Sequence, residues 1–397
     1  MKSKNNKYTN DFIKKIIEDN NAFFIQTRHH LHQYPELSGK EYETSKYIKN
    51  FLDSWNIDYE NAGDNSIVAT IKGKKGKLEN QKTIALRGDI DALPIMEETG
   101  LEWASKNPGV MHACGHDVHG TFMLGAAKIL NELKDEFSGQ VKIIFQESEE
   151  NGAGAKKVLE SNLLNDVDTI IALHDSQELD LGTFALGYET MSAFGAGAHF
   201  VIETSGKKNA ITVAGELVSL ITTLAEENFS KYEQIVMVPT LIQTEEIKDN
   251  IPSKISVYYN SRTLNFSNEE IMQKVLLQAA KKTEELFACK IEAILRSPGK
   301  VVNNNKYFTD LAVDVIKKYF GEESVQFTRP VMSGEDFAHY QEKIQGTYIH
   351  IGGAVNNDYH ILHTSKTCVD DKILSIGIEF LIRYVFEFLN ISDIKGK

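Results

Sequence analysis

Apolar positions recur along the first half of the chain at two alternating periods. A period near 3.6 residues predicts helices over residues 11–28, 41–55, 118–134 and 153–160. Short runs rich in β-branched residues predict strands over residues 66–73, 83–89, 140–146 and 168–175. A polar, basic loop separates the first two runs, which we expect to form a hairpin or neighbouring strands. The alternation of strands and helices is typical of an α/β sheet layered with helices.

From about Met191 to Ser297 the pattern changes and predicts a separate α+β unit. Its expected order is a strand, a helix over 215–227, strands over 234–242 and 255–264, a helix over 268–287 and a last strand. Helices near 306–320 and 371–389 then resume the first pattern. Because 397 residues exceed what one core usually organises, we predict a main domain of residues 1–190 and 299–397. A smaller α+β domain of residues 191–298 would interrupt it.

Composition and charge narrow the function classes. The formal net charge of −13 argues against a general nucleic-acid partner, which needs a basic face. The polar N-terminal segment lacks the apolar core of an export signal, and no uncharged apolar run approaches the roughly 20 residues that cross a bilayer. We therefore expect no membrane partner. Three scattered cysteines do not form a disulfide framework, which favours a reducing cytoplasm.

Candidate chemistry gathers near the ends of predicted strands. In MHACGHDVHG (111–120), Cys114 and His116 stand two apart, so in an extended loop both side chains point the same way. A thiolate and an imidazole suit zinc and similar metals, and glycines allow a tight turn around an ion. A lone Cys-x-His pair is also compatible with an incidental or structural role.

Paired carboxylates follow the strand over 140–146. Because Glu149 and Glu150 are adjacent, one can bind metal while the other takes a proton from water. Such a pair is also common in solvated loops. His174 ends the next apolar strand, where a single histidine is often only hydrogen-bonded.

Two further segments could complete the site. Asp89 and Asp91 lie on one face just past a strand and could orient the metal ligands. Near the C-terminus, YHILHTS (359–365) offers His360 and His363, and spacing does not choose between them.

Several motifs in order resemble one family, the peptidase M20 family of dinuclear metallopeptidases. The resemblance is to its amidohydrolase branch, which includes hippurate hydrolases, bacterial aminoacylases and plant auxin-conjugate hydrolases. It rests on RHHLHQYPELSGKEYET (28–44), the run over residues 86–119, FQESEENGAGA (145–155), ALHDS (172–176), MSGEDFAHY (332–340) and LHTSKTCVDDKIL (362–374).

This resemblance implies a function and a set of roles. The activity would be a metal-dependent amidohydrolase that cleaves the amide of a small N-acyl amino acid. Two divalent ions (Zn, Mn, Co or Ni) would be held with the Cys114 thiolate bridging, and Glu149 would be the general base. The metal ligands would be Cys114, His116, Glu150, His174 and His363. The main domain would be catalytic and the inserted domain a lid.

The resemblance also implies recognition residues in the lid. Asn250 and Arg262 match positions where the family contacts substrate, and an Arg fork suits a carboxylate. Family members often dimerise through the lid, so a homodimer is expected. Arginines on strands are otherwise commonly surface residues.

The chain departs from the family where a lid histidine usually stands. The stretch SGKKNAITVAGE (205–216) places Asn209 near that position, and Asn209 could still donate a hydrogen bond to the substrate carbonyl. FQESEE and LHDS also replace the usual FQPAEE and LHVxP. Two alternatives therefore remain: a catalytically impaired relative that binds a small ligand or partner, and a dipeptidase.

Overall fold

The chain divides into two compact units in the computed structural model, which describes residues 2–75, 81–205, 208–296, 300–356 and 358–390. The first unit comprises Met1–Glu189, Asn303–Arg329 and His339–Lys397. The second comprises Thr190–Val302 together with Pro330–Ala338, a segment that follows it in the sequence. We describe each unit by itself.

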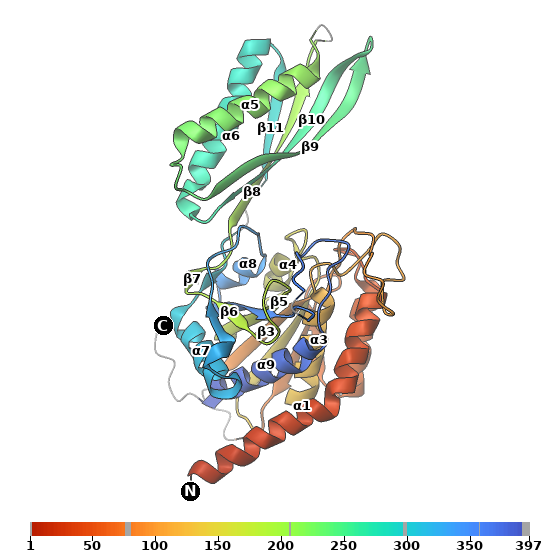
Figure 1. The fold of residues 1–397 in the computed structure, drawn as a ribbon, viewed down its shortest axis with the longest axis vertical. Helices are drawn as coiled ribbons and strands as arrows, with labels where there is room; N and C mark the ends of the chain where they lie inside the picture. Colours follow the sequence, from red (N-terminus) through yellow and green to blue (C-terminus); the bar gives the residue numbers. More distant parts are fainter. Residues whose placement is uncertain (1, 76–80, 206–207, 297–299, 357, 391–397) are drawn as a thin grey trace. The chain divides into compact units, whose positions relative to one another are not determined.

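An eight-stranded mixed sheet forms the centre of the first unit (Figure 1). In spatial order its strands are β1 (Asp58–Asn61), β2 (Ile67–Lys72), β4 (Gln140–Gln146), β3 (Thr83–Asp89), β5 (Thr169–Ser176), β14 (Gly346–Gly352), β6 (Phe184–Leu186) and β13 (Val325–Phe327). The expectation that β2 and β3 form a hairpin or neighbouring strands is wrong, because β4 lies between them and pairs antiparallel with β2 and parallel with β3. A two-stranded pair, β7 (Glu189–Thr190) and β12 (Asn303–Asn304), stands apart.

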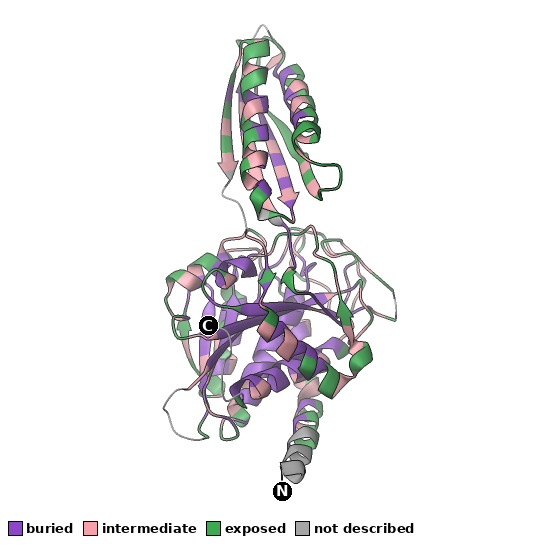
Figure 2. Cartoon of the chain, turned by 90° about the vertical axis from the view of Figure 1, so that its left-hand side faces the viewer, coloured by how far each residue is buried: buried purple, intermediate pink, exposed green. Residues whose placement is uncertain are grey.

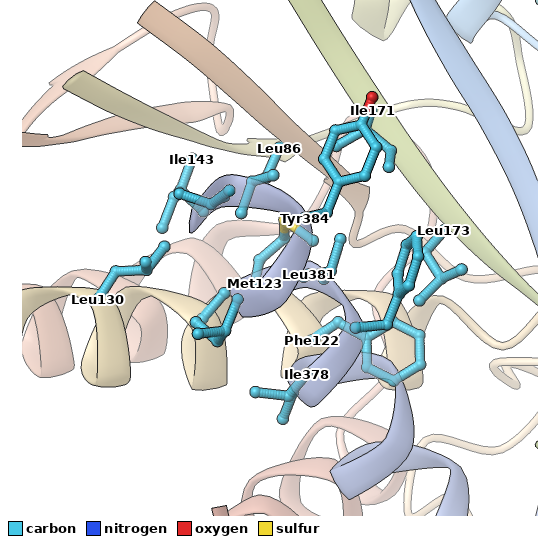
Figure 3. Packing of buried hydrophobic residues seen from close by; sticks show 14 of the residues in the cluster. Leu86, Phe122, Met123, Leu130, Ile143, Ile171, Leu173, Ile378, Leu381 and Tyr384 are labelled. Carbon is cyan, nitrogen blue, oxygen red and sulfur yellow. The ribbon is translucent and has the colours of Figure 1, made fainter. Parts of the chain in front are cut away.

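Helices cover this sheet and bury its apolar side chains. They are α1 (Lys2–Gln33), α2 (Tyr42–Ser54), α3 (His116–Glu132), α4 (Gly154–Glu160), α7 (Lys306–Phe320), α8 (Phe337–Gln341) and α9 (Lys372–Asn390), with a short η2 (Glu322–Ser324). Figure 3 shows Phe122 of α3 and Ile378 of α9 beside sheet residues such as Leu173. The central strands of this sheet are buried (Figure 2), and close packing on both faces gives the first unit a rigid base.

The strand directions bring the predicted polar residues together. Strands β3, β4 and β5 run parallel, so their carboxyl ends meet at one edge of the sheet. Asp89 ends β3, Glu149 follows β4, and His174 lies near the end of β5. Sites of α/β proteins commonly form at such an edge.

The second unit is a four-stranded antiparallel sheet with two helices on one face (Figure 1). Its strands, in spatial order, are β11 (Lys290–Arg296), β8 (Phe194–Glu203), β10 (Ile251–Thr263) and β9 (Ile235–Lys248). The helices are α5 (Ala210–Asn228) and α6 (Glu269–Phe287), and the short η1 (Phe266–Asn268) precedes α6.

Helix α5 begins earlier than the apolar period predicts. Asn209 is its N-cap, and the Oδ1 atom of Asn209 accepts a hydrogen bond from the backbone N–H of Ile211 at 2.9 Å. The predicted mixed sheet with layered helices and a smaller α+β unit is confirmed. In the described part of the chain, no helix is both long and apolar enough to cross a membrane.

Candidate metal centre

A glycine turn leads into α3 and presents the first two candidate ligands. Gly115 has φ 75°, in the left-handed region, and a Cβ there would collide with the carboxylate of Asp175. Only glycine readily adopts this backbone conformation and also leaves room for the Asp175 carboxylate. The turn leaves Cys114 just before the helix and His116 as the first helical residue, both buried.

The sulfur of Cys114 lies between two histidines from distant segments. Its Sγ is 3.7 Å from His174 Nε2 and 3.2 Å from His363 Nε2. His363 Nε2 is also 3.6 Å from Glu150 Oε1, which lies 3.8 Å from His116 Nε2. The structure therefore brings all five predicted ligands into one cluster, within overlapping groups whose donor atoms are at most 4.8 Å apart.

Of the two C-terminal histidines, His363 belongs to a group with Cys114 and Glu150. His360 Nε2 lies 3.4 Å from Asp358 Oδ2, whereas His363 reaches the cluster from a backbone with φ 62°. The backbone N–H of His363 donates to the carbonyl of Ala113 at 2.8 Å, directly beside Cys114.

Hydrogen bonds orient the imidazoles toward the centre. His116 Nδ1 lies 3.1 Å from Asp91 Oδ1, and His174 Nδ1 donates to the carbonyl of Asp175 at 2.7 Å. These contacts leave both Nε2 atoms facing the cluster. Asp91 is itself held by the Ser38 hydroxyl at 2.7 Å and by the backbone N–H of Glu150 at 3.0 Å.

The donor set fits a divalent metal. His116 Nε2 and Glu150 Oε1 are buried but have no hydrogen-bond partner among the residues that the structure describes. A buried polar atom without a hydrogen bond costs free energy, so we expect these two atoms to bind a ligand. A thiolate, imidazoles and a carboxylate together suit zinc or a neighbouring transition metal.

Electrostatics in the absence of a cation support the same conclusion. Burial raises the pKa of the Cys114 thiol well above its usual value. Burial also raises the pKa of the Glu150 carboxyl. Both shifts favour the protonated forms, and a bound cation would act in the opposite direction by favouring the thiolate and the carboxylate.

Glu149 lies at the rim of this cluster. It is half-buried on the turn after β4, and its carboxylate falls in one group with His116 and Glu150. Glu149 and Glu150 therefore lie at the same site, as they must if one is to bind metal and the other to take a proton.

A second buried layer lies beneath the ligands and was not predicted in full. Asp89 pairs with Arg87 at 2.6 Å and with His119 Nδ1 at 2.5 Å, and His119 Nε2 lies 2.8 Å from Asp175 Oδ1. The sequence signal for His119 was its position three residues after His116, on the same helix face. The signal for Asp175 was its place in LHDS, where the family pattern has an apolar residue.

In the second unit, the two predicted recognition residues lie far apart. Asn250 is exposed in the turn between β9 and β10, with φ 63°, whereas Arg262 is the penultimate residue of β10. They are twelve positions apart along an extended strand, which is about 40 Å. They cannot both contact one small substrate from the same chain.

The guanidinium of Arg262 packs against two glycines of the same unit. A Cβ at Gly195 would lie 3.3 Å from its Nη1 atom, and a Cβ at Gly334 would lie 2.6 Å from it. Gly334 belongs to the MSGEDFAHY motif. Because glycine has no side chain, the guanidinium can lie against the backbone at both positions.

Known proteins resemble this chain along most of its length. It is 33% identical over 361 residues to an N-acetyl-L-cysteine deacetylase of Bacillus subtilis, covering 88% of this chain and 84% of the relative. It is 30% identical to thermostable carboxypeptidase 1 of Saccharolobus solfataricus, covering 92% and 95% of the two chains.

A solved structure shares the fold. A dinuclear metal-binding peptidase of the M20 family from Bacillus subtilis superposes with a TM-score of 0.78 at 30% identity, covering 94% of this chain and 99% of the other. The relatives confirm the predicted class, a hydrolase of amide bonds. Residues 85–387 match Peptidase family M20/M25/M40, and this chain belongs to that family.

Proposed function

We propose that the chain removes the acyl group from N-acyl amino acids, using two divalent ions held by Cys114, His116, Glu150, His174 and His363. The observation that carries the proposal is the convergence of these donors from separate segments, with two buried donor atoms that make no hydrogen bond to the described residues. Buried donors of this kind repel one another or hold protons unless a cation is present. Their joint presence therefore supports an enzyme over a relative that has lost its metal.

Residues of the chain would transfer the proton of the attacking water and orient the metal ligands. When bound, the ions would polarise the amide carbonyl and make water a better nucleophile. Glu149 would take the proton of the attacking water and deliver it to the leaving nitrogen. Asp91 would hold the His116 ring in place through Nδ1, and Asp89 would anchor the layer below.

The second unit would supply recognition and act as a lid over the catalytic first unit. Arg262 would bind the substrate carboxylate, because its planar fork can donate two parallel hydrogen bonds. Because Asn250 lies about 40 Å away along β10, it would contact a substrate held by the other subunit of a homodimer. The Asn209 side chain already caps α5, so only its amide N–H groups would be left for a substrate carbonyl.

Strand β9 is the surface that we propose for this homodimer. It is one of the two edge strands of its sheet, and residues 238–248 are exposed although they include apolar residues such as Leu241 and Ile242, 50% and 46% exposed. A long exposed apolar edge is a template for pairing with another strand. Sedimentation of Leu241→Lys should show monomers where the wild type is dimeric; an unchanged dimer would rule out this edge.

Compartment and metal identity complete the proposal. Free Cys114, Cys289 and Cys368 support a reducing location such as the cytoplasm. The mixed sulfur, nitrogen and oxygen donors support zinc, with manganese, cobalt or nickel as alternatives.

The deciding experiment combines metal content with substrate profiling. The purified chain would be loaded with Zn, Mn, Co or Ni, analysed for metal, and offered N-acetyl, N-benzoyl and longer N-acyl amino acids beside dipeptides. About two ions per chain with release of a free amino acid from N-acyl substrates would support the proposal. Faster cleavage of dipeptides than of N-acyl amino acids would identify the chain as a dipeptidase. Bound metal without turnover would favour a binding protein, and a chain that binds no metal would refute the proposed metal site.

A further inference from the structure

Arg28 is a buried arginine in the RHHLHQ segment, to which the proposed function gives no role. Its side chain is 1% exposed at the end of α1. Its Nε donates to Asp117 Oδ2 at 3.0 Å, and its Nη1 donates to the Val369 carbonyl at 2.8 Å and to Asp371 Oδ1 at 2.6 Å. A buried guanidinium is costly unless it is fully paired, so these contacts form a defined junction.

The partners of Arg28 belong to two segments that carry candidate ligands. Asp117 directly follows His116 in the first turn of α3. Val369 and Asp371 end the irregular segment in which His363 stands. Arg28 therefore joins the carboxylate of the residue next to His116 to the segment that carries His363.

His363 needs such support more than the other ligands do. Its side chain is 53% exposed, whereas those of His116 and His174 are 1% and 10% exposed. It belongs to no helix or strand, so sheet hydrogen bonds cannot fix its position as they fix that of His174.

A second set of contacts runs parallel to the first. Ser365 stands two residues after His363, and its hydroxyl donates to Glu98 Oε2 at 2.6 Å. The backbone carbonyl of Ser365 accepts a hydrogen bond from the backbone N–H of Glu98 at 2.8 Å. Neighbouring Glu97 lies 3.2 Å from His32 Nε2, and His32 Nδ1 lies 3.0 Å from Asp117 Oδ2. The path thus returns to the carboxylate that Arg28 binds.

We propose that Arg28 is a positioning residue of the metal centre, which holds the His363 segment against the start of α3. This inference rests on the proposed function, because it requires His363 to bind metal. Lysine would keep the charge but offers one nitrogen in place of a fork, so it cannot bind both Asp117 and the C-terminal segment as Arg28 does.

The rival explanation is that Arg28 only stabilises the fold. Arg383 in α9 is a matched control, since it is 2% exposed and pairs with Glu379 at 2.6 Å. Its guanidinium also lies 4.1 Å from the centre of the Tyr319 ring. Arg383→Lys should therefore lower stability without touching the metal centre.

The test measures metal affinity rather than turnover. Zinc would be titrated into metal-free wild type, Arg28→Lys and Arg383→Lys by calorimetry with a competing chelator, beside melting curves of the metal-free proteins. We expect Arg28→Lys to weaken the binding of at least one ion about 10- to 100-fold, as loss of an outer support does. Arg383→Lys should bind zinc as the wild type does, even if its melting temperature falls equally.

A milder pair of variants keeps the test decisive if Arg28→Lys does not fold. Ser365→Ala removes only the hydroxyl bond to Glu98 and should weaken zinc binding roughly threefold, while Ser365→Thr should restore it. Wild-type zinc affinity in a folded Arg28→Lys, or in Ser365→Ala where Arg28→Lys does not fold, would overturn the inference and leave the proposed function intact. A wild-type chain without zinc affinity would overturn the proposed function, and this inference with it.

Discussion

The two units differ in how they hold their polar residues. In the first, the polar groups at the strand ends are mostly buried and contact one another, as His119 does between Asp89 and Asp175. In the second, Asn250 is exposed and Arg262 partly so, on a sheet whose edge strands are β11 and β9. Metal chemistry needs fixed donors, whereas recognition tolerates residues on a surface.

The difference predicts which property each unit controls. Substitutions at the buried cluster should change metal binding or the chemical step. Substitutions in the second unit should change substrate preference, apparent affinity or assembly and leave the metal content alone. A variant of the second unit that lost metal would break the comparison.

The largest expected effect is on turnover in Glu149→Gln. The amide cannot accept a proton, so kcat should fall by about 10²- to 10⁴-fold while metal content stays near that of the wild type. Steady-state kinetics and elemental analysis would measure both. Glu150→Gln is the contrast, because it should lose metal; near-normal turnover in Glu149→Gln would refute the general-base assignment.

The next effect is on metal affinity in Cys114→Ala. Removal of the sulfur that lies between His174 and His363 should weaken binding by at least about 100-fold, more than loss of an outer support does. Chelator competition would measure it. Cys289→Ala, in the second unit, should bind metal normally, and equal affinities in the two variants would exclude Cys114 as a ligand.

A smaller effect should appear in Gly334→Ala. The new Cβ would lie 2.6 Å from Arg262 Nη1 and displace the guanidinium, so KM for N-acyl amino acids should rise about tenfold with little change in kcat. Analogues without a carboxylate should react as before. Gly215→Ala on α5, where a Cβ meets no described atom within 4 Å, is the matched control. A fall in kcat alone would argue against carboxylate binding by Arg262.

Much of the first unit could be predicted because its signals are local. Strand β4 and helix α7 have the predicted bounds, since a buried strand and an amphipathic helix each carry a clear period. The strand order could not be predicted, because the pairing of β2 with β4 joins segments about 70 residues apart. The three-residue strands β6 and β13 were missed, because so short a run carries no period.

The site was predicted unevenly for the same reason. Motif order pointed to the six residues from Cys114 to His363, but spacing could not separate His363 from His360, a choice that depends on the path of an irregular segment. The junction at Arg28 joins residues more than 300 positions apart, so no sequence period could reveal it. In the second unit, the motif match predicted that Asn250 and Arg262 both contact the substrate. Only the length of β10 in the structure shows that they lie too far apart to contact the same small molecule.

The smallest expected effect concerns Asn209, where stability and activity are opposed. Histidine is a poorer N-cap than asparagine, so Asn209→His should lower the free energy of unfolding of the second unit by about 1 kcal/mol through loss of the bond to Ile211. If the missing lid donor limits catalysis, the same variant should raise kcat/KM on N-acyl amino acids, because an imidazole can donate to the developing oxyanion. Asn209→Ser, which keeps a cap without a ring, controls for stability. Reduced stability without faster hydrolysis would mean that Asn209 is only a cap, and that this chain stabilises the oxyanion from another residue.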